Sequence, residues 1–337
     1  MNTDNSRIAY FDNLKFVLIC LVVIAHGFAN HIGENANLPS VFVFINTFHM
    51  PLFIFVSGLF YSCKNISQRI ILLVTYGLYF KGLIWLNDGI LGHTWGKFEL
   101  FKEESMPWFL FVLAVWEGFA YIVRKMNPKF VLTGAVIVGC LAGHDAMVTG
   151  SEFFSRMIVW FPFFYMGVLV DREKLTAFME EKKPTHSALL KIICMILMFL
   201  YAAICIVRRA DIWNLMGLII PRTLFADMPF KCTLLTRLIY YVGVSALGIG
   251  FMSIIPTVNI GWGGGITKWG KRTLQVYIYH IFIRNILDKN SWSRNLCSTN
   301  LHILLYIMIN ILIVIVLSQK IFSIPTDYIK ENIFQKN

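Results

Sequence analysis

Three side chains able to take part in acid–base or charge chemistry stand at the two ends of one apolar stretch, FDNLKFVLICLVVIAHGFAN. Asp12 and Lys15 lie near its start, and His26 follows eleven residues after Lys15. On a helix, that spacing is three turns plus about 20°, with a rise of roughly 16 Å. Lys15 and His26 therefore share one face, and Asp12 lies on the same side. The pattern indicates an ion pair at one end of the helix and, at the other, a group that accepts protons near neutral pH.

Further polar side chains stand in apolar segments later in the chain. His49 and Ser57 lie in FINTFHMPLFIFVSGLFY, Trp108 in MPWFLFVL and Arg156 in SRMIVWFPFFYMG. Most have a structural explanation when taken alone: a contact beside a proline kink, an aromatic anchor at a membrane surface, or a guanidinium that extends to that surface. Four separate segments nevertheless bring His26, His49, Trp108 and Arg156 to similar depth. This convergence predicts a shared polar site.

The stretch GWGGGITKWGKRTLQVYIYH carries a third polar group. Lys271 and Arg272 precede a predicted helix, and a helix N-terminus with basic residues suits phosphate oxygens. Thr273, Tyr277 and His280 then follow at positions i, i+4 and i+7, a polar stripe along an otherwise apolar helix. The glycine run is no nucleotide-binding fingerprint, because no strand precedes it. The basic residues also fit a simple bias of positive charge towards the cytoplasm, and both explanations stay open.

The elements that must position these residues are membrane helices. The 337 residues are 57% hydrophobic and 15% charged, with a mean hydropathy of +0.64, whereas soluble domains are about 45–50% apolar and 25% charged. Helices satisfy their own backbone hydrogen bonds in lipid, and spans need about 20 apolar residues each. The sequence predicts an all-α integral membrane protein, with residues 1–337 as one bundle of about ten transmembrane helices. The predicted spans begin near Leu14, Val41, Ile70, Trp108, Phe130, Phe154, Leu189, Leu234, Leu274 and Leu301.

The distribution of lysine and arginine predicts that both termini are cytoplasmic. With that orientation, most of the basic loop residues face the cytoplasm, as the positive-inside rule requires. The segment 208–231 is an exception, because it is basic and would be external. A short extra helix or re-entrant piece around 212–220 would change this count. The Asp12–Lys15 pair also has a purely structural explanation, as an i,i+3 ion pair at the membrane surface whose lysine extends its ammonium group to water, and both explanations stay open.

Charge and cysteine content exclude two classes of function. The formal net charge is +11, but the basic residues stand in short loops that flank helices, where orientation and anionic lipid head groups explain them. We therefore expect membrane lipid as a partner and no nucleic acid. The seven cysteines form no CxxC pair and show no metal-ligand spacing, so we expect no metal site.

Five segments carry a family resemblance across most of the chain. FDNLKFVLICLVVIAHG, FHMPLFIFVSG, PWFL, SRMIVWFPFFYMG and GKRTLQVYIYH, in this order, resemble membrane acyltransferase family 3, and within it the fucose 4-O-acetylase-like branch. The resemblance implies a multi-pass protein of the plasma or inner membrane with ten helices. It also implies cytoplasmic acetyl-CoA as co-substrate without a bound cofactor, and as acceptor a hydroxyl of a surface glycan or lipid-linked sugar. Many members have arginine where this chain has Lys15, which lacks the bidentate fork of a guanidinium.

The resemblance and the spacing together assign roles to the polar residues. His26 is predicted to be catalytic, either as a general base or as a transient acyl carrier. Cations at the cytoplasmic end would bind the phosphates of the donor, and the remaining polar side chains would shape the acceptor side or the tunnel. The predicted donor-binding residues are Asp12, Lys15, Lys271 and Arg272, and the predicted acceptor or tunnel residues are His49, Ser57, Trp108, Arg156, Tyr277 and His280.

A transporter of a polar metabolite or glycan is the alternative function. Its pathway would need similar buried polar residues, but inverted repeats and paired interrupted helices would be expected as well. The sequence shows neither feature by inspection. A purely structural or receptor role explains neither the depth nor the number of the buried polar side chains.

Overall fold

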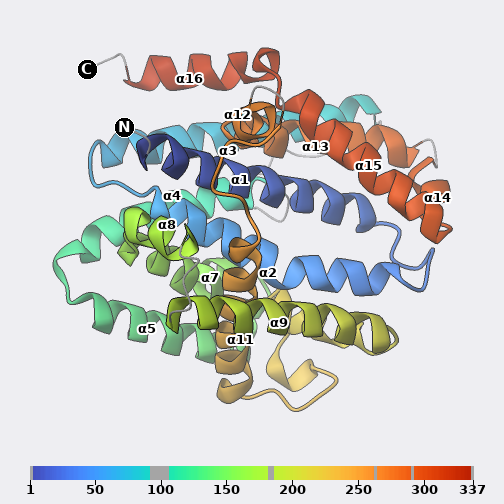
Figure 1. Cartoon of the computed structure of the whole chain (residues 1–337), viewed down its shortest axis with the longest axis horizontal. Coiled ribbons are helices and arrows are strands. Elements are labelled where there is room, and N and C mark those ends of the chain that lie inside the picture. The colour runs from blue at the N-terminus through green and yellow to red at the C-terminus, as the bar shows by residue number, and fades with distance from the viewer. Residues whose placement is uncertain (1–2, 92–105, 181–185, 262–263, 290–291, 335–337) are drawn as a thin grey trace.

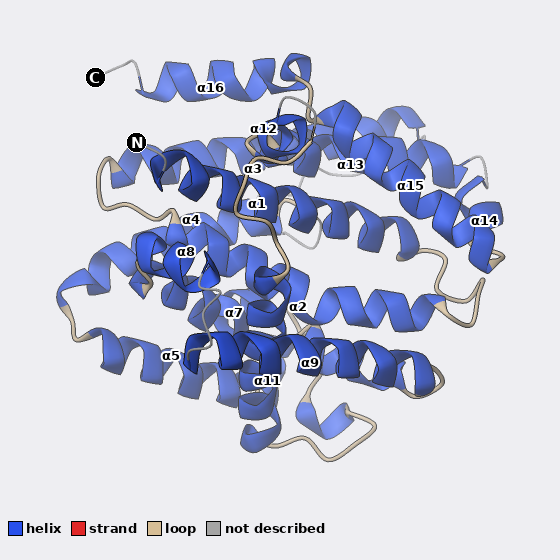
Figure 2. Ribbon diagram, viewed as in Figure 1, coloured by secondary structure: helices blue, strands red, loops and turns tan. Residues whose placement is uncertain are grey.

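The structure, a computed structural model, describes residues 3–91, 106–180, 186–261, 264–289 and 292–334. These residues form helices and connecting loops, without a strand among them (Figure 2). The prediction of an all-α protein is confirmed. The ten longest helices of the described residues contain the ten predicted segments: α1 (Thr3–Phe28), α2 (Leu38–Leu59), α3 (Ile66–Leu91), α4 (Trp108–Ile122), α5 (Pro128–Leu141), α7 (Glu152–Leu169), α9 (His186–Val207), α11 (Leu234–Ser253), α13 (Thr273–Lys289) and α15 (Asn300–Leu317).

Six of these helices are long and apolar enough to cross a membrane, namely Ala9–Phe28, Leu38–Leu59, Ile66–Ile90, Ser187–Val207, Leu234–Ser253 and Asn300–Leu317. A seventh span would be α7 together with α8 (Arg172–Glu180), which are bent by 87° at the break between them. The number of spans beyond these, and the side on which the termini lie, stay predictions. Short helices fill several loops: α6 (Ala146–Thr149), α10 (Met216–Ile219), α12 (Gly265–Gly270) and α14 (Trp292–Leu296). The segment 212–220, for which the sequence allows a short extra helix, contains the 3-10 turn Ile212–Leu215 and α10.

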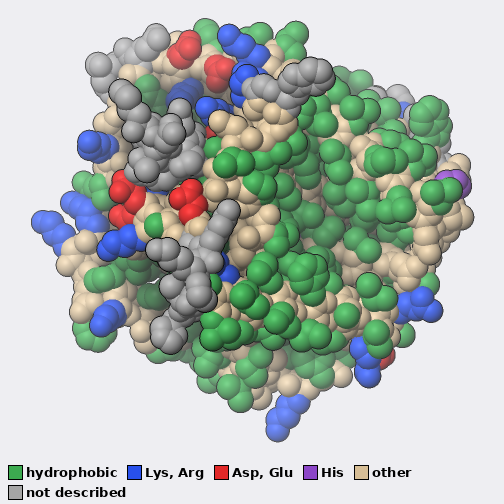
Figure 3. Space-filling view, viewed as in Figure 1, with side chains coloured by type: hydrophobic (Ala, Val, Ile, Leu, Met, Phe, Trp, Pro, Cys, Tyr) green, Lys and Arg blue, Asp and Glu red, His purple; other side chains and the backbone are tan. Residues whose placement is uncertain are grey.

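Burial separates a central helix from peripheral ones. In α1, 78% of the most apolar window is buried, against 22% in α9 and 28% in α15. Figure 1 shows α1 (dark blue) between α2 on one side and α13 and α15 on the other. Hydrophobic side chains cover much of the surface in Figure 3, and most of the acidic side chains visible there lie on the left of the view. An apolar outer surface suits lipid, so the polar residues of α1 lie in the protein interior.

A close crossing between two glycines brings α2 and α7 together. A Cβ at Gly58 of α2 would overlap the carbonyl oxygen of Phe164 in α7, and a Cβ at Gly167 would overlap that of Phe55. Only glycine lets the two backbones approach this closely, which is the usual role of small residues in membrane helix packing. The crossing fixes α2 and α7, which carry Ser57 and Arg156.

Asn13 links α1 to the segment that precedes α13. Its side-chain amide donates to the carbonyl oxygens of Pro256 at 2.9 Å and Val258 at 2.8 Å, and it accepts a hydrogen bond from the hydroxyl of Thr267 at 2.6 Å. Asn13 is fully buried, so these bonds satisfy a polar group that would otherwise be costly. They hold α12 against the N-terminal end of α1.

Candidate active site

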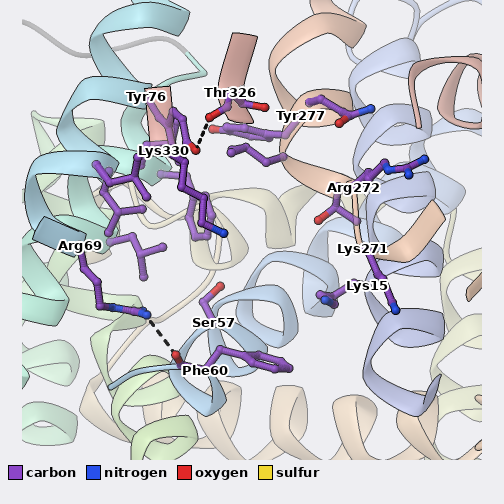
Figure 4. A pocket seen from close by; sticks show the side chains of 18 of the residues that line it. Lys15, Ser57, Phe60, Arg69, Tyr76, Lys271, Arg272, Tyr277, Thr326 and Lys330 are labelled. Carbon is purple, nitrogen blue, oxygen red and sulfur yellow. Dashed lines mark hydrogen bonds between the residues drawn. The ribbon is translucent and has the colours of Figure 1, made fainter. Parts of the chain in front are cut away.

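A cavity of about 680 Å³ lies beside the N-terminal half of α1 (Figure 4). Residues of α1, α2, α3, α4 and α13 line it, together with residues of the C-terminal helix α16 (Ile324–Phe334). We call it the inner cavity. Its charged lining residues are Lys15, Arg69, Glu117, Lys271, Arg272, Asp327 and Lys330. Five cations thus face two carboxylates, and the cavity favours an anionic ligand.

Two of the five cations are already held by carboxylates. Lys15 Nζ lies 2.7 Å from Asp12 Oδ1, as the spacing in the sequence predicts. Arg69 donates from Nε and Nη2 to the two carboxylate oxygens of Glu117, a bidentate pair in which Glu117 is only 2% exposed. Such pairs have a defined geometry and fix the walls of the cavity.

Close packing brings Lys271 and Arg272 to the same cavity. Gly270, at the end of α12, lies against the carbonyl oxygen of Asp12 so closely that a Cβ would overlap it. The two basic residues that follow line the inner cavity near Lys15 (Figure 4). Arg272 also donates to the carbonyl oxygen of Ser318 at 3.3 Å. Lys271 has no ion pair or hydrogen bond from its ammonium group to any residue that the structure describes.

A second cavity, of about 340 Å³, lies beside the other end of α1. We call it the outer cavity. It brings together three residues predicted from the sequence, with polar neighbours from α3, α7 and α13. Its lining residues are His26, Ile84, Asp88, Met106, Trp108, Glu152, Arg156, Ile281, Arg284 and Asn285.

His26 pairs with His280 across α1 and α13. His26 Nδ1 lies 2.9 Å from His280 Nε2, and the two rings are stacked at 10°. His280 Nδ1 lies 2.9 Å from the carbonyl oxygen of Val276, which can only accept, so this nitrogen carries a proton. In a buried, neutral His280 the Nε2 atom is then an acceptor, and His26 Nδ1 must donate to it. The arrangement assigns the free lone pair of His26 to Nε2, which has no hydrogen bond to any described residue.

Arg156 is held in place by acidic and aromatic neighbours. Its Nη2 pairs with Glu152 one turn earlier on α7, and Glu152 also pairs with Arg222 at 2.9 Å. The guanidinium carbon lies 4.9 Å from the centre of the Trp108 ring, as in a cation–π contact. Arg156 therefore lines the outer cavity in a fixed orientation.

Tyr277 stands between the two cavities. It lines the inner cavity, and its hydroxyl donates a hydrogen bond to the carbonyl oxygen of Met106, which lines the outer one. Phe109 of the inner cavity packs edge-on against both Tyr277 and Trp108 of the outer cavity. An aromatic wall thus separates the cations at one end of α1 from His26 at the other.

Ser57 and His49, which were predicted for the acceptor side or the tunnel, do not line the outer cavity. Ser57 lines the inner cavity, where its hydroxyl donates to the carbonyl oxygen of Phe53. His49 is buried and lines neither cavity, and its Nδ1 atom donates to the carbonyl oxygen of Ile45 at 2.8 Å. His49 is therefore a neighbour of the site and not part of either cavity wall.

The sequence interpretation missed several charged residues of both cavities. Glu117 stands inside the apolar segment WFLFVLAVWEGFAYI, and a carboxylate within a membrane helix is by default functional or paired. Its position was a usable signal. Arg69 and Arg284 stand near the ends of predicted helices, where a basic residue is usual, and their inward orientation depends on packing that no local pattern reveals.

One of three comparisons with known proteins found a match. A family model described as an acyltransferase domain matches residues 8–319. This range contains every residue named above for the outer cavity, and all of the charged residues of the inner cavity except Asp327 and Lys330. No curated protein and no solved structure matches the chain significantly.

Proposed function

This chain belongs to acyltransferase family 3 and is a multi-pass membrane protein, and we propose that it is an O-acetyltransferase that uses acetyl-CoA. The acetyl group would move from cytoplasmic acetyl-CoA to a hydroxyl of a surface glycan or lipid-linked sugar. The protein would act in the plasma or inner membrane.

The single observation that carries the proposal is the state of His26. Its Nδ1 proton is committed to His280, so the basic Nε2 atom is left free at the outer cavity. A positioned imidazole that removes a proton from an attacking hydroxyl contributes about 10²–10⁴-fold to a rate. The buried partner fixes the tautomer and the ring orientation, as the third group of a catalytic triad does.

The proposed reaction uses this lone pair directly. The acceptor oxygen attacks the carbonyl carbon of the thioester, and its proton moves to His26 Nε2. An ester C–O bond forms, the C–S bond breaks, and coenzyme A leaves as a thiolate that takes the proton from His26. The same lone pair would also suit a transient acetyl-imidazole, which splits the transfer into two steps.

The inner cavity supports a coenzyme A donor. Coenzyme A carries phosphates and a long arm that ends in a thiol. Its binding site therefore needs cations at a wide entrance for the phosphates and a narrow passage for the arm. The inner cavity has five cations and ends at Tyr277 and Phe109. An acyl group delivered to His26 would have to pass this aromatic wall, so Tyr277 would release the Met106 carbonyl oxygen when the arm enters.

The outer cavity supports a sugar as acceptor. Its two arginines face two carboxylates, and Asn285 adds an amide. A lining that alternates fixed donors and acceptors suits hydroxyl groups, each of which both donates and accepts. Such a site would orient one hydroxyl towards His26.

The test uses inside-out membrane vesicles, in which the cytoplasmic face is accessible. Labelled acetyl-CoA is added, and label on a glycan or lipid-linked sugar is measured for the parent and for His26→Gln. Gln keeps polarity and approximate size but lacks a basic, nucleophilic nitrogen. We expect transfer to fall by roughly 10²-fold or more. His302→Gln is the matched control, since His302 is an exposed histidine on α15 that lines neither cavity.

Near-parental transfer by His26→Gln would overturn the catalytic role of His26. Absence of labelled product from the parent would overturn the acetyl-CoA or glycan assignment. A labelled protein trapped at low temperature in the parent, and absent in His26→Gln, would favour the acetyl-imidazole route over direct transfer.

A further inference from the structure

The chain continues beyond the family match into a helix that faces the inner cavity. The match ends at residue 319, and the 3-10 turn Lys320–Ser323 and α16 follow. In Figure 1 this helix (red) lies along the outside of the bundle, and it packs against α3. The hydroxyl of Tyr76 on α3 donates to the carbonyl oxygen of Thr326 at 2.8 Å and ties α16 to the wall of the cavity (Figure 4).

The face of α16 that lines the cavity is mostly polar. Ser323, Thr326, Asp327, Lys330 and Phe334 all line the inner cavity, and their spacing of three and four residues places them on one side of the helix. A helix that only covered the bundle would present leucine or isoleucine on this side. A polar stripe beside a cavity rich in cations indicates contact with a polar ligand.

Large apolar side chains lie exposed on the opposite side of the segment. Ile321, Ile324 and Tyr328 are 60–68% exposed, whereas Asp327 and Lys330 lie on the side that lines the cavity. An amphipathic helix of this kind lies at a membrane surface with its apolar side towards lipid. Lipid contact on one side and the Tyr76 bond on the other would hold α16 over the cavity.

Lys330 is one of the cations still available to a ligand. Lys15 and Arg69 are paired with Asp12 and Glu117, whereas the Lys330 ammonium has no ion pair or hydrogen bond within the described part of the chain. The neighbouring Asp327 accepts a hydrogen bond from the Ser323 hydroxyl at 2.7 Å. Figure 4 shows Lys330 reaching into the cavity that Lys15 and Lys271 also line.

We infer that α16 completes the donor site, with Lys330 binding a phosphate at the nucleotide end of the acyl donor. This inference rests on the proposed function for the identity of the donor. Phe334 follows Lys330 by one turn and lines the same cavity, so its ring would contact the flat base beside that phosphate. The donor site thus includes a segment outside the matched acyltransferase domain.

The test measures the KM for acetyl-CoA in vesicles of phosphatidylcholine that contain the full-length protein. Lys330→Gln removes one charge, and Lys320→Gln removes one charge from the same segment at an exposed residue that does not line the cavity. We expect Lys330→Gln to raise the KM about five- to tenfold with little change in kcat, because one charge-assisted contact is lost. Lys320→Gln should leave both constants near the parental values.

A second arm repeats both variants with acetyl-dephospho-CoA, which lacks the 3′-phosphate. If Lys330 binds that phosphate, the parent loses affinity for this donor and Lys330→Gln causes little further loss. If it binds the diphosphate, the effect of Lys330→Gln is the same with both donors. Either result supports the inference.

Two outcomes would overturn it. One is an equal KM for Lys330→Gln and Lys320→Gln. The other is an effect of Lys330→Gln that appears only when anionic phosphatidylglycerol is added to the vesicles, because Lys330 would then bind a lipid head group. A parent that transfers no acetyl group from acetyl-CoA would instead contradict the proposed function, so the two failures are distinguishable.

Discussion

The inner and outer cavities lie at opposite ends of α1 and differ in how their charges are balanced. The inner one, of about 680 Å³, has five cations against two carboxylates. The outer one, of about 340 Å³, has two arginines against two carboxylates, beside the neutral His26–His280 pair. An excess of cations attracts a polyanion, whereas a balanced set of donors and acceptors binds and orients neutral polar groups.

Under the proposed function, the inner cavity would bind the donor and the outer cavity would hold the reacting groups. Changes in the inner cavity should act on the stability of its walls and on the KM for the donor. Changes in the outer cavity should act on kcat, because the groups there contact the reacting hydroxyl or orient His26. Three variants test whether this division holds.

The largest expected effect is the loss of the buried pair in the inner wall. Glu117→Ala leaves Arg69 without its bidentate partner in a part-buried position. Removing one partner of a buried ion pair costs about 3–5 kcal/mol. We expect a large fall in the thermal midpoint of the detergent-solubilised protein, measured from the loss of helical circular dichroism.

The double variant Arg69→Leu/Glu117→Leu is the control for this prediction. It removes both charges, and apolar replacement of a whole pair is often near neutral. It should recover much of the stability but lose affinity for acetyl-CoA. A single variant Glu117→Ala that is as stable as the parent would show that the pair does not hold the wall.

A smaller effect is expected for Lys15, whose ammonium lies 2.7 Å from Asp12 at the inner cavity. Lys15→Ala removes a charge-assisted contact to the donor, worth about 1.5–3 kcal/mol. The KM for acetyl-CoA should rise by roughly 10- to 100-fold, while Lys15→Arg keeps the cation and should retain measurable activity. An unchanged KM in Lys15→Ala would reduce Lys15 to an interfacial lysine, and the inner cavity would lose one of its assigned donor contacts.

The smallest expected effect concerns His280, which acts on the outer cavity through His26. His280→Ala removes the acceptor of the Nδ1 proton, so His26 loses its fixed tautomer and orientation. We expect kcat to fall about tenfold with little change in the KM for acetyl-CoA, because His26 stays a base but is no longer held in one tautomer and orientation.

His280→Gln is the conservative comparison, because its amide oxygen can accept the same hydrogen bond. It should recover part of the rate, and the pH–rate profile of His280→Ala should differ from that of the parent. If His280→Gln and His280→Ala behave alike, or if the KM changes instead of kcat, His280 does not act by positioning His26.

The lengths of the apolar segments in the sequence predicted much of the fold. The ten predicted segments each lie in a long helix, because a run of apolar residues in lipid has few alternatives to a helix. The breaks were harder to predict. The bend of 87° between α7 and α8, and the short turns between α9 and α11, occur in loops where no periodic pattern constrains the chain.

Within the site, the sequence determined which residues share a helix face. Lys15 and His26 line separate cavities along α1, and Asp12 pairs with Lys15, because helical geometry fixes residues three and eleven apart. The family resemblance followed from the same segments. The match over residues 8–319 confirmed acyltransferase family 3, while the fucose 4-O-acetylase-like branch stays a prediction.

Tertiary structure alone decided which helices face one another. No local pattern in the sequence reveals the partners of His280 and Glu117. The partner of His280 lies 254 residues away, and that of Glu117 lies 48 residues away. Lys330 reaches the inner cavity only because α16 folds back over it. Hydropathy sets the length and type of each helix, but the rotation and neighbours of a helix depend on close packing between glycines and on buried polar pairs, which form only when distant segments meet.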